Sequence, residues 1–280
     1  MKIIENHITK DLLKLVPLLE ECIFSYTAGS LAEGFGNSTS DIDVYVILND
    51  HPNYENIQKQ AKINADKIDY LIGQESSDVV FNFVYKKVRY DVTYMSLKKV
   101  NKVLKRIEEI DYNSDEKIIS LSSYEKDWIH RLKYSQNLTV DSVFNKFKEK
   151  IDFKKFNYFM ASFESDGYSS ILEDLQGAYS SRDYGTAYFL VKKLSDVALN
   201  AYLAINGETN PSFKWTYRKL QRYLENGGEV SIAEKYMLIH GTTFDSDKIN
   251  DFLRIGVSFC QEVNDLTQSK INQIQYEGAF

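Results

Sequence analysis

Two aspartates one residue apart, Asp41 and Asp43, open an apolar segment and directly follow a glycine-rich loop. Residues 29–48 read GSLAEGFGNSTSDIDVYVIL. Because side chains alternate along a strand, both carboxylates are predicted on one face of a strand whose VYVIL half is buried. Asp91, in RYDVTYM, is a third acid on a later predicted strand that could lie beside the first. Carboxylates in this pattern could hold one or two Mg²⁺ ions, because Mg²⁺ prefers oxygen ligands.

The loop before the aspartates carries groups that could bind the phosphates bridged by such ions. Its glycines would let backbone N–H groups approach an anion closely, and serine would add a hydroxyl donor. The candidates are Gly29, Ser30, Gly34 and Gly36, with Ser40 as a second hydroxyl. An ordinary turn is the alternative, and Ser before Asp is a common turn composition, so Ser40 could equally cap the turn. For Asp91 the alternative is a surface ion pair with Arg89 or Lys87.

The ordered set resembles the signature of the polymerase-β-like nucleotidyltransferase superfamily, which is a Gly-Ser pair, a spacer, Asp-x-Asp and a later acid. Its parts in this sequence are Gly29-Ser30, the spacer from Leu31 to Ser40, Asp41-Ile42-Asp43, and Asp91. The resemblance implies Mg²⁺-dependent transfer of a nucleoside monophosphate, AMP from ATP in the first instance, with pyrophosphate leaving. It also implies that Asp41 and Asp43 ligate the metal bound to the triphosphate. Asp91 would complete a second metal site or accept the acceptor's proton.

The C-terminal half resembles, more loosely, the helical domain of small-molecule nucleotidyltransferases such as the aminoglycoside and lincosamide adenylyltransferases. That resemblance implies that cations of the helical domain reach the triphosphate and that a glutamate acts as general base. The matching residues are Lys192, Lys193 and Lys214 for the cations and Glu173 for the base. The alternatives for the cations are a solvated pair between Lys192 and Asp196 and an exposed basic face that includes Arg218 and Lys219. The alternatives for the base are Asp174, Glu164 and Asp91.

Hydrophobic periodicity predicts the elements that must position these residues. Helices are predicted at residues 9–21, 53–72 and 184–207, the second ended by Gly73, and most of the chain after residue 97 has helical periodicity. Strands are predicted at residues 22–29 and 41–48, followed by a hairpin whose arms are residues 78–85 and 88–95. Because Lys86-Lys87 is not a favoured two-residue turn, the loop of this hairpin could be longer.

These elements predict an α+β protein in two domains. The first, residues 1–125, would be a mixed sheet with flanking helices, and the second, residues 126–280, an all-α helical bundle. The active site is expected in the cleft between them. Tyr-rich helices of the bundle could line an acceptor pocket, because tyrosine combines an apolar ring with a hydrogen-bonding hydroxyl.

Charge and composition narrow the expected partners. A net charge of −6 gives no basic footprint for long nucleic acids, which favours a small-molecule hydroxyl as acceptor over RNA. A tRNA, RNA or protein acceptor, or a degenerate domain that only binds, stays open as an alternative. Two cysteines, Cys22 and Cys260, form no disulfide framework, and no segment reads as a membrane span or leader, so a cytoplasmic protein is expected. A homodimer is possible.

Overall fold

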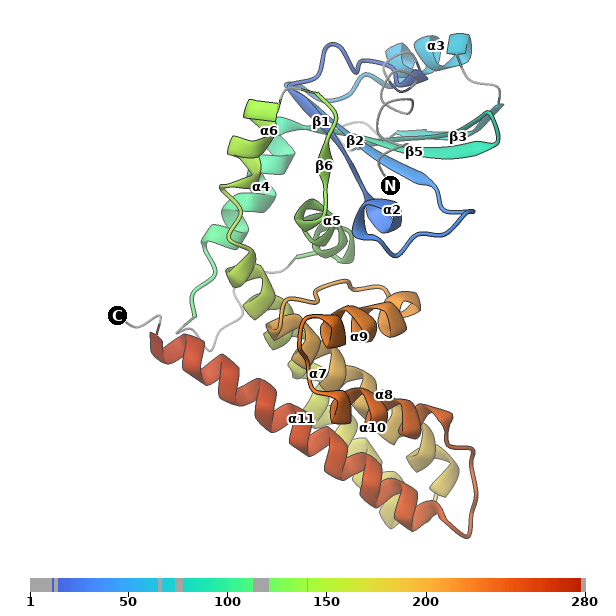
Figure 1. Ribbon diagram of the computed structural model, residues 1–280, viewed down its shortest axis with the longest axis vertical. Helices are drawn as coiled ribbons and strands as arrows, with labels where there is room; N and C mark the ends of the chain where they lie inside the picture. The colour runs from blue at the N-terminus through green and yellow to red at the C-terminus, as the bar shows by residue number, and fades with distance from the viewer. Residues whose placement is uncertain are drawn as a thin grey trace. The chain divides into compact units, whose positions relative to one another are not determined.

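The computed structural model describes residues 12, 15–64, 67–73, 78–112, 121–139 and 141–277. They divide into two compact units (Figure 1). The first takes the described residues up to Glu109 together with residues 121–152, and the second takes residues 153–277 with the described part of residues 110–120. The predicted boundary between residues 125 and 126 falls inside helix α5, Ser123–Lys133, which belongs to the first unit.

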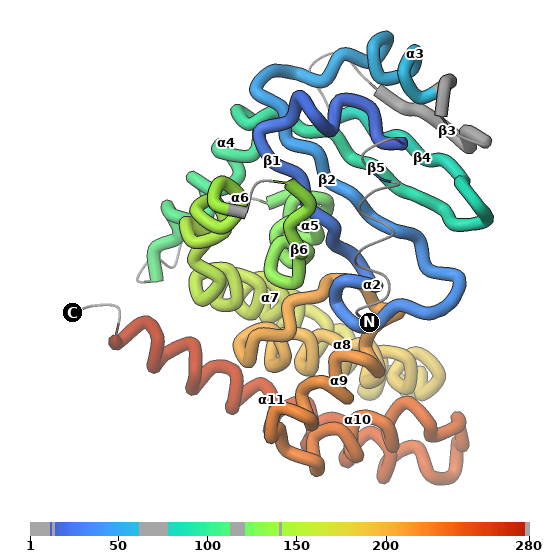
Figure 2. The backbone as a smooth tube through the Cα atoms, turned by 45° about the horizontal axis from the view of Figure 1, so that its top comes forward, coloured from blue at the N-terminus to red at the C-terminus, as the bar shows by residue number. Residues whose placement is uncertain are grey.

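The first unit is built on a six-stranded mixed sheet in the order β3-β4-β5-β2-β1-β6. Its strands are β1 (Phe24–Ala28), β2 (Ile42–Leu48), β3 (Lys67–Gly73), β4 (Val79–Tyr85), β5 (Val88–Ser96) and β6 (Gln136–Asn137). Strands β2 and β5 are parallel and lie side by side in the middle of the sheet (Figure 2), whereas the other neighbouring pairs are antiparallel. The helices are α2 (Gly29–Glu33), α3 (Tyr54–Asn64), α4 (Leu97–Glu108), α5 (Ser123–Lys133) and α6 (Asp141–Lys148). The predicted mixed sheet with flanking helices is confirmed.

The two faces of the sheet have different partners. On one face Val44, Val92 and Phe81 pack in a cluster with residues of the N-terminal segment and with Ile57 of α3. On the other face α5 and α6 cover β1, since Trp128 Nε1 donates to the Tyr26 hydroxyl at 2.8 Å and the Tyr26 and Phe144 rings lie 5.4 Å apart. Alternation of side chains along the strands therefore leaves Asp43 and Asp91 on the face that α5 covers.

Two predictions between residues 53 and 95 need correction. The predicted helix 53–72 is wrong in its second half: α3 ends at Asn64, and Lys67–Gly73 pairs antiparallel with β4 as strand β3. Residues 67–73 form a strand because pairing with the edge of β4 outweighs their weak local helix propensity. The hairpin is confirmed, but its loop is only two residues long. Lys86 and Lys87 have φ angles of 48° and 67°, the left-handed turn that matches the twist of paired strands.

The predicted helix 9–21 lies partly outside the described residues, which exclude 9–11, 13 and 14, and Leu12 and Leu15 are helical. Of its described part, Pro17–Glu21 forms turns rather than helix, and Leu18 has a positive φ of 58°. Proline lacks the N–H that a helix interior needs, which accounts for the turn at this point. The strand predicted next is confirmed as β1, although it begins at Phe24.

The second unit is helical, as predicted for the C-terminal part. Its helices are α7 (Phe153–Ser180), α8 (Tyr184–Ile205), α9 (Thr216–Glu225), α10 (Val230–Gly241) and α11 (Ile249–Glu277), with a 3₁₀ turn η1 at Phe213–Trp215. Helix α8 packs against α7 and α11, and its predicted apolar stripe, which includes Ala187, Val191 and Leu194, is buried in their common core. Among the described residues, no helix has the length and apolarity that a membrane crossing requires.

Candidate active site

The two acids predicted on separate strands lie directly opposite each other. Parallel strands β2 and β5 place Asp43 beside Asp91 in register, one residue into β2 and three into β5. Paired positions project to the same face, so the two carboxylates share one end of the sheet. Asp41 lies just before β2, and its carboxylate is 3.8 Å from the Arg89 guanidinium. The structure thus brings together the acids that the sequence predicted to converge.

Gly29 is required by the position of the Asp43 side chain. Strand β1 pairs Ala28 with Asp43, and the next residue, Gly29, has a φ of +75°. A Cβ at this position would lie 1.9 Å from Asp43 Oδ2. The glycine therefore makes room for the carboxylate and allows the left-handed turn into α2. This geometry explains in physical terms why a Gly-Ser pair precedes Asp-x-Asp.

The rest of the loop is held by its own hydrogen bonds. The Ser30 carbonyl accepts from the N–H groups of Phe35 and Gly36 at 2.8 and 2.7 Å. Gly34 caps α2 in a left-handed conformation, with a φ of 82°. The Ser40 hydroxyl accepts from the Asn37 N–H at 2.9 Å, which is the turn-capping alternative stated for it. Binding of phosphate by Ser30 or Ser40 stays a prediction.

An arginine that the sequence did not single out contacts the acids. Arg131 of α5 donates from Nη1 to Asp43 Oδ1 at 2.7 Å and from Nε to Asp127 Oδ2 at 2.6 Å. Asp127 lies one helical turn before Arg131, so it orients the guanidinium toward the sheet. Arg131 is thus a positively charged partner held between two carboxylates of the first unit. A short-range sequence signal for this contact does not exist, since Asp43 is distant in the chain.

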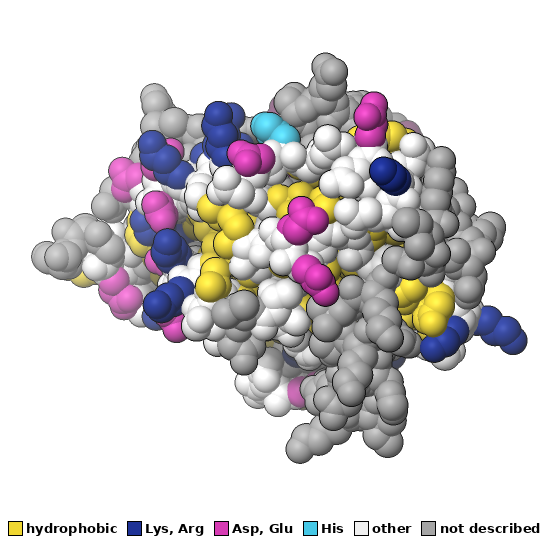
Figure 3. Space-filling model, turned by 90° about the horizontal axis from the view of Figure 1, so that it is seen from above, with side chains coloured by type: hydrophobic (Ala, Val, Ile, Leu, Met, Phe, Trp, Pro, Cys, Tyr) yellow, Lys and Arg dark blue, Asp and Glu magenta, His cyan; other side chains and the backbone are white. Residues whose placement is uncertain are grey.

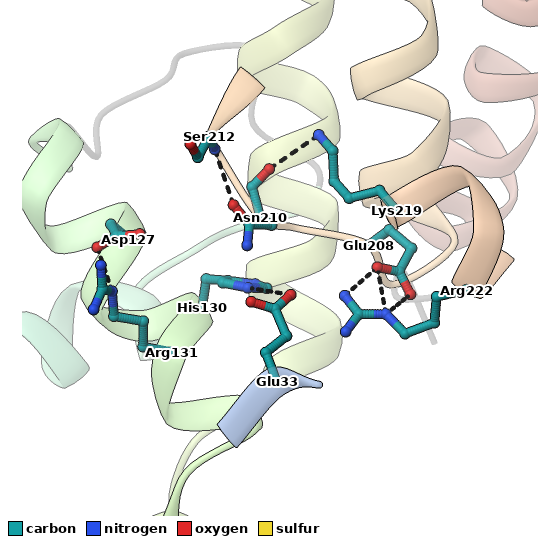
Figure 4. Close-up of polar contacts among 9 residues, drawn as sticks. All are labelled: Glu33, Asp127, His130, Arg131, Glu208, Asn210, Ser212, Lys219 and Arg222. Carbon is teal, nitrogen blue, oxygen red and sulfur yellow. Dashed lines mark hydrogen bonds and ion pairs between the residues drawn. The ribbon is translucent and has the colours of Figure 1, made fainter. Parts of the chain in front are cut away.

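Helix α5 is anchored at both ends. Its N-terminus has a capping box, in which Ser122 and Glu125 satisfy each other's backbone N–H groups, and Arg106 of α4 binds Glu125. Near its C-terminus, buried His130 contacts buried Glu33 of α2, with 3.0 Å between Nε2 and Oε1 (Figure 4). The two ends together fix the helix turn that carries Arg131.

Burial and mutual repulsion raise the pKa of the paired acids. Burial is the largest cause of the raised pKa of Asp91, about 6, and the neighbouring Asp43 carboxylate adds to it. The pKa of Asp43 is also raised by burial, although Arg131 opposes that change. A cation that bound here would relieve the repulsion between the two carboxylates.

The donor atoms fit a divalent cation, with fewer acids than predicted. Among the described side chains, none donates a hydrogen bond to the buried Oδ1 of Asp91. No group of three Asp, Glu, His or Cys side chains in the described part of the chain forms a metal-binding cluster, because Arg131 holds Asp43 and Asp41 lies near Arg89. Mg²⁺ bound by one or two carboxylates normally completes its shell with water and substrate phosphates. Asp43 and Asp91 suit that role, and Asp41 as a third ligand stays a prediction.

The four predicted residues of the second unit lie in different surroundings. Lys192 donates to the Tyr188 hydroxyl and to the carbonyls of His240 and Thr242, so it caps the C-terminal end of α10. The ion pair suggested between Lys192 and Asp196 does not form, because Asp196 instead contacts Tyr236 and His240. The other three, Lys193, Lys214 and Glu173, are exposed. Lys214 also lies over the Trp215 ring, 5.0 Å from its centroid.

The second unit holds two cation networks that the sequence did not predict, one buried and one partly buried. Lys219, predicted on an exposed basic face, is buried and donates to Asn200 Oδ1 at 2.8 Å and to the Asn210 carbonyl at 3.0 Å. Arg222, one turn later, binds both carboxylate oxygens of Glu208 (Figure 4). Next to this pair is a cavity of about 270 Å³, whose lining includes Glu208, Lys270 and the tyrosines Tyr202 and Tyr223. Tyrosine side chains were predicted to line an acceptor pocket, and binding of an acceptor in this cavity stays a prediction.

Comparison with known proteins agrees with this arrangement. Residues 10–158 match the model of the nucleotidyltransferase domain family. A search of curated proteins finds no match. Among solved structures, a nucleotidyltransferase-like protein from Exiguobacterium sibiricum 255-15 is similar over 96% of this chain and 87% of its own, with 9% identity and a TM-score of 0.49. The family model covers more than half of the chain and includes the Gly-Ser pair and all three acids, so the protein belongs to the nucleotidyltransferase domain family.

Proposed function

We propose that the protein transfers a nucleoside monophosphate, AMP from ATP in the first instance, to a hydroxyl of a small-molecule acceptor in a Mg²⁺-dependent reaction. The observation that carries the proposal is the register of β2 and β5, which places Asp43 and Asp91 side by side above Gly29. Two adjacent carboxylates on a rigid sheet are suited to holding cations that stabilise phosphate charge rather than to acting as nucleophiles.

Asp43 and Asp91 have different roles in this proposal. One or two bound Mg²⁺ ions would supply charge neutralisation and align the triphosphate, and Asp41, Asp43 and Asp91 are the residues that would hold them. Arg131 fixes the orientation of Asp43 through the 2.7 Å contact. Asp91, with a pKa of about 6, is largely ionised at neutral pH and can accept the proton of the attacking hydroxyl. The acceptor oxygen then bonds to the α-phosphorus, and pyrophosphate leaves with the electron pair of the broken P–O bond.

The cations assigned to the triphosphate are Lys193 and Lys214, both exposed and able to reach a ligand. Lys192 already has three acceptors, so its role in this proposal is to hold α8 against the end of α10. Glu173 is the candidate base of the helical unit, and Asp91 is its alternative. E173Q separates these two assignments, because undiminished transfer by E173Q would leave Asp91 as the base, whereas D91N would also remove a proposed metal ligand.

Surface charge supports a small acceptor. On the face shown in Figure 3, the described acidic and basic side chains are interspersed rather than gathered in one basic stripe. A protein that tracks a nucleic-acid backbone presents a groove of positive charge along it. Together with the net charge of −6, this pattern favours a small molecule over RNA as acceptor.

A labelling experiment tests the proposal. The full-length protein is incubated with Mg²⁺, each labelled nucleoside triphosphate, and a panel of aminoglycosides, lincosamides, tRNA and cell extract, and labelled products are identified by mass. D43N should lower transfer at least about 100-fold, because positioned charge supplies much of the acceleration. D251N is the matched control, since Asp251 is an exposed acid that pairs with Arg254 of the same helix, α11. Equal transfer by D43N and D251N would refute the assignment of Asp43 to the active site. Label found on RNA or protein would refute a small-molecule acceptor.

A further inference from the structure

A buried asparagine lies beside the carboxylate pair on the next strand. Asn82 of β4 is directly opposite Asp91 of β5, which is itself directly opposite Asp43 of β2. Because directly paired residues project to the same face of a sheet, the three polar side chains form a row across β4, β5 and β2. The row thus continues past the two acids to an amide.

The surroundings of Asn82 are unusual for a polar residue. It interrupts the apolar strand VVFNFVY, and its side chain is only 4% exposed. Its neighbours Phe81 and Phe83 are fully buried in the cluster on the opposite face. Asparagine is disfavoured inside strands, and a valine or leucine would suit a buried position of this kind better. Packing and strand propensity therefore do not account for an amide here.

Two acceptor oxygens of this row are buried without a donor. Among the described groups, neither Asn82 Oδ1 nor Asp91 Oδ1 has a hydrogen-bond partner. A buried polar group left unsatisfied costs about 1–3 kcal/mol, and a native structure retains one where something satisfies it in the working state. Two neighbouring acceptors call for a cation or for a molecule that donates to both.

A divalent cation satisfies both oxygens at once. Hard cations accept carboxylate and side-chain amide oxygens alike, and the first unit offers no cluster of three acidic, histidine or cysteine ligands among its described residues. A neutral oxygen next to Asp91 would add a further ligand without adding to the repulsion between Asp43 and Asp91. We propose that Asn82 is a metal-positioning residue, whose amide oxygen binds the divalent cation held by Asp43 and Asp91, directly or through a cation-bound water. This proposal rests on the proposed function, which requires that cation.

Direct Mn²⁺ binding tests the proposal without any measurement of activity. Free Mn²⁺ is measured by electron paramagnetic resonance in titrations of the full-length wild type, N82L, N82D and S25A. N82L keeps the approximate volume but removes the oxygen, and should weaken Mn²⁺ binding about 10-fold, as loss of a supporting contact at a metal site does. N82D keeps an oxygen and adds charge, so it should bind Mn²⁺ at least as tightly as the wild type.

S25A is the matched control for removal of a buried polar group from the sheet. Ser25 of β1 is fully buried, and its hydroxyl has no hydrogen-bond partner among the described residues, but it lies on the face opposite Asp43. S25A should bind Mn²⁺ as the wild type does. Urea unfolding in EDTA establishes that each variant is folded.

The outcomes separate this proposal from the proposed function. Mn²⁺ affinity of folded N82L within twofold of the wild type would refute the role of Asn82 and leave the role of Asp43 and Asp91 intact. If N82L does not fold, N82D decides, because weaker Mn²⁺ binding by N82D than by the wild type contradicts an oxygen ligand at this position. Absence of Mn²⁺ binding by the wild type would refute both proposals together.

Discussion

Replacing Asp91 by asparagine should make the metal-free protein more stable at neutral pH. The Asp91 carboxyl has a pKa of about 6 in the folded protein, against an ordinary value of 3.8, because burial and Asp43 disfavour its charged form. Between these two pH values the folded chain binds a proton that the unfolded chain has lost. The free energy of unfolding therefore falls as pH rises from about 4 to about 6 and is level above that range. Asparagine does not ionise, so the free energy of unfolding of D91N should not fall in this way as pH rises.

The size of the effect follows from the two pKa values. A difference of about two pH units corresponds to roughly 3 kcal/mol, since one unit corresponds to about 1.4 kcal/mol. Asp91 is only half-buried, and solvent screening reduces the expected gain to about 1–2 kcal/mol at pH 7.5. At pH 4.5 the gain should shrink to about a third, because this pH lies less than one unit above the unfolded pKa of 3.8, so only about a third of the interval up to the folded pKa has been crossed.

Urea unfolding in EDTA measures this gain if the signal comes from the first unit alone. The chain has two tryptophans, Trp128 in α5 and Trp215 in η1 of the second unit. A W215F background leaves Trp128, which is fully buried against Tyr26, as the fluorescent probe of the sheet and α5. D41N in the same background is the control and should change stability by less than about 0.5 kcal/mol, because Asp41 is partly exposed and its contact with Arg89 is long, at 3.8 Å. A D91N variant no more stable than the wild type at pH 7.5, or equally stabilised at pH 4.5, would refute the reasoning.

Three further substitutions test how the site is built. R131Q removes the partner of Asp43 and should lower the free energy of unfolding at pH 7.5 by about 1–2 kcal/mol, because loss of a partly exposed ion pair costs less than loss of a buried one. An unchanged urea midpoint would contradict the pairing. G29A should lower the free energy of unfolding by at least about 1–2 kcal/mol from the positive φ of this position alone. The loss should be smaller in a D43A background, because the carboxylate that meets the new methyl group is then absent. Equal losses in the two backgrounds would show that Gly29 does not make room for Asp43. S122A should cost about 1 kcal/mol by removing the cap of α5, measured by Trp128 fluorescence, whereas no change would mean that the capping box does not hold the helix.

The predictable part of the site comes from local periodicity. Alternation of side chains along β2 and β5 places each acid on a definite face of its strand. The order of the elements along the chain, a strand, a loop, a second strand and a later strand, allows β2 and β5 to be neighbours. The structure confirms the neighbours and adds the register, which puts Asp43 opposite Asp91. Register could not be read from the sequence, because two apolar parallel strands can pair at several offsets. The need for glycine at position 29 depends on the register of β1 and β2. Because Ala28 pairs with Asp43, the next residue lies against the Asp43 carboxylate.

The parts that sequence reasoning missed depend on contacts between distant segments. Arg131 is one of several basic residues on α5, and only the packing of that helix over the sheet brings it to Asp43. Lys219 was predicted as exposed because it lies in a basic run, yet it is buried against Asn200 and Asn210. Lys192 satisfies the end of a helix about 50 residues later in the chain. In each case the charge was visible in the sequence, but its partner was not.

The electrostatics of the first unit favour an incoming cation over a preformed metal cage. Arg131, with one positive charge, only partly compensates Asp43 and Asp127, and the Oδ1 atom of Asp91 has no donor among the described groups. Negative charge that is only partly compensated in a half-buried site binds cations strongly and destabilises the empty fold. A nucleotide that arrives with its own metal ion would bring both the missing charge and the phosphate oxygens that complete the ion's shell. Burial, together with this imbalance, therefore accounts for the raised pKa of Asp91 and for the predicted gain in stability of D91N, and in the proposed function the substrate would complete the site.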